Sequence, residues 1–106
     1  MTSFDDRKKG FEKKFAHDAE LIFKVAARRN KLLGYWLAEK LGEADAEAYA
    51  RSVVVADLEE AGDEDVMRKV MGDIGAKGAA VTEADVRAKL AVLEVQAKEQ
   101  IMTELS

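Results

Sequence analysis

Apolar side chains recur along the first forty residues at the spacing of one helix face. At about 100° per residue they lie within about 20° of a single line: Phe4, Phe11, Phe15, Ile22 and Leu33. This pattern predicts one helix from an N-cap at Ser3 to Leu41, with Gly42 as its stop. Such a helix would be roughly 58 Å long, too long for a compact chain of about 100 residues to cover.

The excess length predicts an arm and a domain. We expect residues 1–18 to project or fray as a helical arm, and residues 19–106 to form the folded unit. Gly10 lies inside the arm, where a mid-helix glycine costs about 1 kcal/mol relative to alanine and favours fraying.

Three more helical segments follow, punctuated by glycines. One runs from Asp45 to Ala61, and the next begins at Asp63 as its N-cap. The last opens at Thr82 with a capping box to Asp85 and a staple between Val81 and Val86. The expected core positions are Tyr49, Ala50, Val53, Val54, Leu58 and Ala61, then Met67, Val70, Met71 and Ile74, then Val86, Leu90, Leu93, Ala97 and Ile101. Short connections favour antiparallel neighbours, so we predict an all-α four-helix bundle with a protruding arm.

Composition narrows the class of protein. The 106 residues suffice for one domain, and their many alanines favour a thin core made by close helix approach, with Tyr35 and Trp36 at its edge. Proline and cysteine are absent, which excludes disulfides and thiolate chemistry. No apolar run reaches the roughly 20 residues that cross a bilayer, so we expect a cytoplasmic protein without membrane insertion.

Charge is distributed unevenly between the arm and the domain. Residues 1–31 hold nine Lys and Arg against five Asp and Glu, a net charge of +4, whereas residues 32–106 hold eight against 16, a net charge of −8. An acidic body disfavours nucleic acid as a partner, because nucleic-acid binders need a basic face. The basic arm favours an acidic or polar protein groove, or phosphate.

No constellation of catalytic residues is found, so we do not expect an enzyme. His17 is the single histidine and cysteine is absent, so a nucleophilic triad of the Ser-His or Cys-His kind lacks partners except through His17. We expect no metal site, and we interpret His17 and the Arg28, Arg29 and Lys31 group as solvated, the latter with scope to extend the arm's binding surface. The glycine-rich run GDIGAKGAA lacks the Lys-Ser or Lys-Thr pair of a phosphate loop, which leaves only weak nucleotide binding and no firm cofactor.

The arm itself has the pattern of a helix that binds in a groove. Its phenylalanines alternate with basic residues, and the predicted partner-binding set is Phe4, Arg7, Lys8, Phe11, Lys14 and Phe15. Aromatic anchors at helical spacing supply affinity, while the cations can pair with acidic groups at the rim.

Two blocks of the sequence resemble a known family. The run FDDRKKGFEKKFAHDAELIFKVAARRNKLLGYWLAEKLG, followed by LEEAGDEDVMRKV, is similar to the zeta subunit of the alpha-proteobacterial F-type ATP synthase. The resemblance implies a four-helix bundle whose N-terminal segment, about residues 1–19, inserts into the catalytic head and blocks ATP hydrolysis. The implied partners are catalytic, non-catalytic and rotor subunits of the head, and the free protein is expected to be a monomer.

Two other function classes stay open at this point. One is a regulatory helical module that binds a nucleotide in the bundle or at its basic end. The other is a general adaptor that joins unrelated proteins. Nucleotide titration would identify the first class, and capture of partners from lysate would identify the second.

Overall fold

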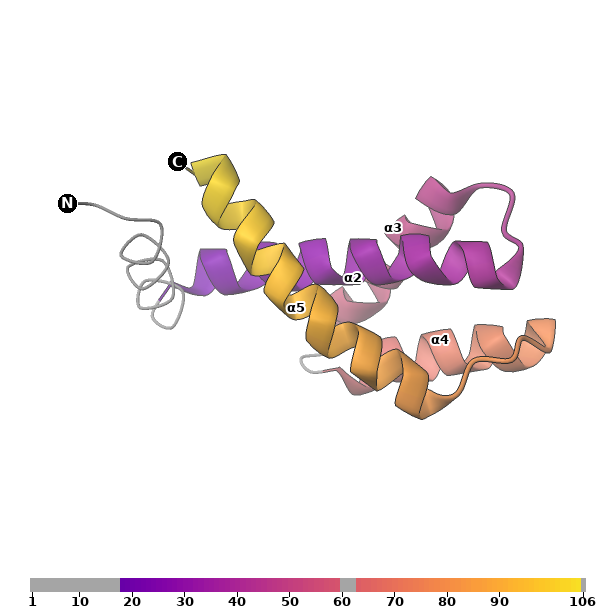
Figure 1. The fold of residues 1–106 in the computed structure, drawn as a ribbon. Helices are drawn as coiled ribbons and strands as arrows, with labels where there is room; N and C mark the ends of the chain where they lie inside the picture. Colours follow the sequence, from indigo (N-terminus) through magenta and orange to yellow (C-terminus); the bar gives the residue numbers. More distant parts are fainter. Residues whose placement is uncertain (1–17, 60–62, 106) are drawn as a thin grey trace.

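The computed structural model describes residues 18–59 and 63–105. This part of the chain contains four helices and no strand, which confirms the predicted all-α four-helix bundle. The helices are α2 (Ala19–Leu41), α3 (Ala46–Glu59), α4 (Glu64–Lys77) and α5 (Glu83–Leu105). Figure 1 shows α5 crossing α2 obliquely, with the end of α5 on the same side of the molecule as the start of α2.

Helix α2 is the central element, since it packs against each of the other three. The main core draws on all four helices and includes Leu33, Leu37, Val53, Val70 and Val86. A second, smaller cluster contains only α2 and α5 residues: Leu21, Val25, Ala97, Ile101 and Met102. The first turns of α2 therefore have α5 as their only core partner among the described helices.

The backbone leaves the helical conformation at Asp18, so the predicted unbroken helix from Ser3 to Leu41 is wrong at this residue. Asp18 has φ −112° and ψ 105°, and its carboxylate accepts hydrogen bonds from the backbone N–H of Glu20 and Leu21. These donors would otherwise bond to carbonyls of a preceding turn, so Asp18 starts a new helix as its N-cap. The domain boundary after residue 18 stays a prediction.

The other helix ends agree in part with the caps predicted from the sequence. Gly42 and Gly78 adopt φ 70° and 66° as C-caps, where a residue with a side chain would be strained. The capping box of α5 is present: the Asp85 N–H donates to Thr82 Oγ1 at 3.1 Å, and the Thr82 N–H donates to the Asp85 carboxylate at 3.0 Å. Asp63 precedes α4 as predicted but makes no capping hydrogen bond, because its carboxylate binds Arg29 instead.

The predicted core of α4 and α5 is largely confirmed. Every expected α5 position is buried, and in α4 only Met71 is partly exposed. In α3, Tyr49, Ala50 and Val53 are buried and Val54 is half-buried, whereas Ala61 lies outside the described residues.

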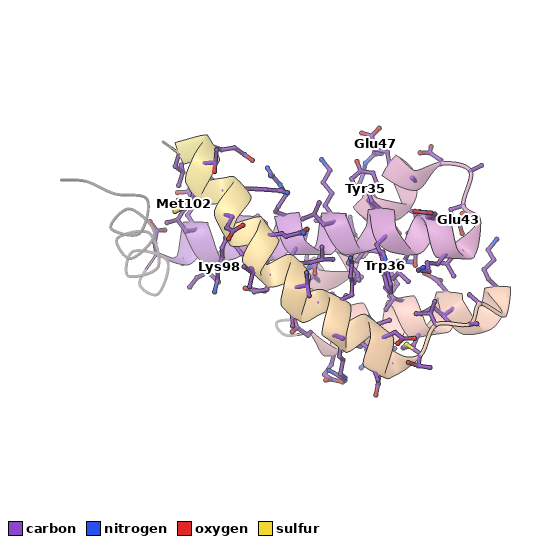
Figure 2. The ribbon with its side chains drawn as sticks, in the orientation of Figure 1. Tyr35, Trp36, Glu43, Glu47, Lys98 and Met102 are labelled. Atoms are coloured by element: carbon purple, nitrogen blue, oxygen red, sulfur yellow. The ribbon has the colours of Figure 1, made fainter. Side chains whose placement is uncertain are left out.

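Two expected core residues are exposed. Leu58 is 57% exposed, because it lies about 140° around the helix from Val53. Tyr35 is also exposed, with the Lys31 ammonium 6.0 Å from its ring centre. Trp36 packs at the core edge as predicted, and Figure 2 shows it and Tyr35 on α2.

Candidate functional site

The residues predicted to bind a partner lie outside the described part of the chain. They are Phe4, Arg7, Lys8, Phe11, Lys14 and Phe15, and their role stays a prediction. His17 lies outside it as well. The structure does describe the place where this segment joins the bundle, which is the start of α2.

The first turns of α2 carry an apolar face that the described helices leave about half exposed. Ile22 and Phe23 are 45% and 55% exposed. Ile22 lies within about 20° of Leu33 around the helix, and Phe23 points in the same direction as Leu41 five turns later, yet Leu33 and Leu41 are buried. Of the predicted apolar stripe, Ile22 is about half exposed and Leu33 is buried, whereas Phe4, Phe11 and Phe15 lie outside the described residues.

A shallow depression of about 370 Å³ lies beside this face. Its lining comes from α2, α3 and α5, and consists of Phe23, Lys24, Ala27, Arg28, Lys31, Val54, Ile101 and Glu104. Three of these residues are basic and one is acidic, so the depression combines an apolar floor with a positive rim.

Ion pairs hold part of that rim in place. Arg28 of α2 donates two hydrogen bonds to the Glu104 carboxylate of α5, at 2.6 and 2.9 Å, and a third to Gln100 at 2.8 Å. The pair raises the pKa of Arg28 and lowers the pKa of Glu104. Lys24 is 3.2 Å from Glu20 on its own helix. Figure 2 shows Lys98 and Met102 on the stretch of α5 that crosses this end of α2.

Arg29 does not belong to the solvated basic face that the sequence suggested. It is 8% exposed, and its guanidinium donates to Asn30 Oδ1, to Glu94 of α5 at 3.1 Å and to Asp63 at 2.8 Å. Arg29 thus connects α2 with α5 and with the start of α4. Burial raises the pKa of the nearby Asp57 carboxyl, against the opposing effect of the positive charge on Arg29.

A larger depression of about 610 Å³ lies between α3 and α4, and its lining includes three basic residues and one acidic residue, Asp65. Arg51, Arg68 and Lys69 line it together with Ser52. Arg68 and Lys69 already pair with carboxylates of α4, at 2.9 Å to Asp65 and 2.8 Å to Asp73, which reduces their pull on a phosphate.

Residues 18–59 and 63–105 contain no group of three His, Cys, Asp or Glu side chains placed to hold a metal ion. In the same part of the chain, no helix is both long and apolar enough to span a bilayer.

The described helices form a domain with a half-exposed apolar face at the start of α2. Such a face is suited to binding another protein. A family model for ATPase inhibitor subunit zeta matches residues 1–100, and the chain belongs to that family. The match spans the arm as well as the bundle, and it confirms the resemblance noted in the sequence. A comparison with curated proteins found no match.

Proposed function

We propose that this chain is a non-enzymatic inhibitory subunit of an F-type ATP synthase that blocks ATP hydrolysis by inserting residues 1–18 into the catalytic head. The observation that carries the proposal is the family match, because it begins at residue 1 and so includes the arm. A second observation supports the proposal: α2 starts with its own N-cap at Asp18, so the arm can order independently of the bundle.

In this proposal the arm enters a cleft between a catalytic and a non-catalytic subunit, close to the rotor. Phe4, Phe11 and Phe15 are the apolar anchors, and Arg7, Lys8 and Lys14 pair with acidic groups of the cleft. Ordering of the arm on binding consumes part of the interaction free energy, which keeps the inhibition reversible. The free protein is a monomer in the cytoplasm, without cofactor or nucleic-acid partner, and the bundle acts as a plug or docking module.

Deletion of residues 2–15 tests the proposal directly. The full chain is added to the purified catalytic head and ATP hydrolysis is measured. We expect the full chain to inhibit and the deleted chain to have no effect while retaining the helical circular dichroism of the bundle. A deleted chain that still inhibits would refute the role of the arm, and a full chain without effect would refute the proposal as a whole.

Nucleotide binding is the alternative with a specific feature in its favour, the depression that Arg51, Arg68 and Lys69 line. Titration with ATP, followed by backbone chemical shifts, tests it. Saturable shifts centred on Ser52 and Lys69 would support a nucleotide module. An inhibitor that acts through its arm alone requires no saturable nucleotide site in the bundle.

A general adaptor is the remaining alternative. Capture from lysate separates it from the inhibitor, because an inhibitory subunit should retain ATP synthase head subunits, whereas an adaptor should retain other proteins in larger amount.

A further inference from the structure

The start of α2 leaves large apolar side chains at the surface. We define the root patch as Ile22, Phe23 and Ala27 of α2 with Val54 of α3. Ile22 and Phe23 are about half exposed, and Phe23, Ala27 and Val54 line the same depression. Leu58, which is also exposed, lies one helical turn beyond Val54 on α3.

We propose that the root patch is a second contact with the catalytic head of the ATP synthase, separate from the contacts of the arm. The inference rests on the proposed function, since it names the same partner. It adds that the folded bundle contributes binding energy of its own.

Position along the chain is the first reason. Ile22 and Phe23 follow the N-cap Asp18 by four and five residues, which places them about 6 to 8 Å along the helix axis from it. A protein that holds the arm up to residue 15 is thereby brought next to the root patch. The second contact then forms at high effective concentration, so even a modest patch adds affinity.

Chemistry is the second reason. The arm alternates phenylalanines with basic residues, and the root patch continues this character beyond the cap at Asp18: Phe23 is followed by Lys24, Arg28 and Lys31 around the depression. The matching surface is an apolar strip bordered by carboxylates, the same kind of surface that suits the arm. Lys24 and Arg28 already have acidic neighbours, so they favour orientation and association rate, while Phe23 provides the anchor.

The test uses the full chain with substitutions at exposed positions. Phe23→Ser and Ile22→Ser remove the anchors, and Val92→Ser and Val95→Ser are matched controls. Val92 and Val95 are each 52% exposed and lie on the side of α5 that faces solvent. Binding to the purified head is measured by surface plasmon resonance, inhibition by ATP hydrolysis, and folding by thermal melting.

We expect Phe23→Ser to raise the dissociation constant about tenfold or more, because truncation removes an aromatic anchor from the interface, with a parallel loss of inhibition. Both controls should stay within about twofold of wild type, and all four variants should melt as wild type does. If wild type inhibits, and the Phe23 variant binds the head as tightly as wild type and the controls do, the root patch is overturned but the arm mechanism is left intact. Wild type that neither binds nor inhibits would overturn both.

A second copy of this chain is the competing occupant. If wild type forms dimers by sedimentation, Phe23→Ser abolishes them and binding to the head is unchanged, the patch is a self-association surface and the inference fails.

Discussion

Gly34 of α2 lies directly against Ala50 of α3. A methyl group at residue 34 would overlap the Ala50 Cα and would lie 2.9 Å from its Cβ and 3.2 Å from its backbone nitrogen. No side-chain rotation can relieve contacts with backbone atoms. The two helices therefore approach as closely as their backbones allow, as the alanine-rich composition predicted for the core.

Gly34→Ala should destabilise the bundle by at least about 2 kcal/mol, because overpacking at a rigid contact forces α2 and α3 apart. Gly72→Ala is the matched control: Gly72 lies within α4, and a methyl group there meets nothing within 4 Å. Because alanine favours the helix, the control should stabilise the protein by about 0.5 to 1 kcal/mol. Urea unfolding measures both. Equal effects of the two substitutions would contradict the close approach.

Arg29→Met should cost about 2 kcal/mol of stability. The loss of a buried cation leaves Asp63 and Glu94 without their partner, although the partial exposure of both carboxylates moderates the penalty. Arg51→Ala serves as control, since Arg51 is exposed and only 3.9 Å from Glu47, and it should change stability by less than about 0.5 kcal/mol. Arg29→Lys should rescue little, because an ammonium cannot present the guanidinium fork. Chemical denaturation that gives equal midpoints for all three variants would be inconsistent with the ion-pair cluster.

Asp85→Asn should destabilise the protein at neutral pH but not in acid. Hydrogen bonds from Thr82 hold the pKa of Asp85 below its ordinary value of 3.8, so the charged form stabilises the folded state. This contribution is complete above pH 3.8 and is lost as the pH falls through the lowered pKa. The difference in free energy of unfolding between wild type and variant, measured from pH 7 to pH 2.5, should therefore shrink towards the acid end.

Asp57→Asn should have the opposite effect on stability and should stabilise the protein at neutral pH. Burial raises the pKa of Asp57 above 3.8, so the folded state favours the protonated form and stability declines as the pH rises from 3.8 through the raised pKa. The variant should be more stable than wild type at pH 7, and the advantage should vanish below pH 3.8. The same pH series of unfolding curves tests it. A variant less stable than wild type at pH 7 would mean that the attraction to Arg29 outweighs burial.

Phe11→Ala and Phe15→Ala should weaken binding to the catalytic head more than Lys9→Ala. Truncated aromatic anchors typically lose about 1 to 2 kcal/mol, whereas rim charges change mainly the association rate. Dissociation rates at low and high salt distinguish the two effects. An arm that binds by charge alone would show its largest loss with the lysine variant and no inhibition at high ionic strength.

The sequence predicted α5 well because its signals are local. The Thr82 and Asp85 capping box marks the start of the helix, and the repeat from Val86 to Ile101 marks its buried face. Local hydrogen bonds and helical periodicity are both properties of neighbouring residues, and they are preserved when the helix packs.

The Arg29 cluster could not be predicted in the same way. Arg29 and Asp63 have the appearance of surface residues, and only packing brings together partners that are 34 and 65 positions apart in the sequence. One local signal was available, since Asn30 stands on the inward side of α2, where a polar residue among apolar neighbours indicates a buried hydrogen-bond network.

For the candidate site, the sequence predicted an apolar stripe without predicting where its cover ends. Ile22 and Leu33 have equivalent positions in the pattern, but Leu33 is buried in the core that all four helices form, whereas Ile22 belongs to the first turns of α2, whose buried residues cluster with α5 alone. How far a neighbouring helix extends is a tertiary property, so Phe23 was not recognised. The partner-binding roles assigned to residues 4–15 stay predictions.

The cap at Asp18 has a mechanical consequence. A continuous helix carries bending and twist through its ladder of main-chain hydrogen bonds, but the N–H groups of Glu20 and Leu21 are bound to the Asp18 side chain. If the arm is held by the catalytic head as proposed, a bending or twisting force on it would meet this interruption of the ladder at Asp18 before it reached α2. The bundle could then keep its own orientation while the head moves.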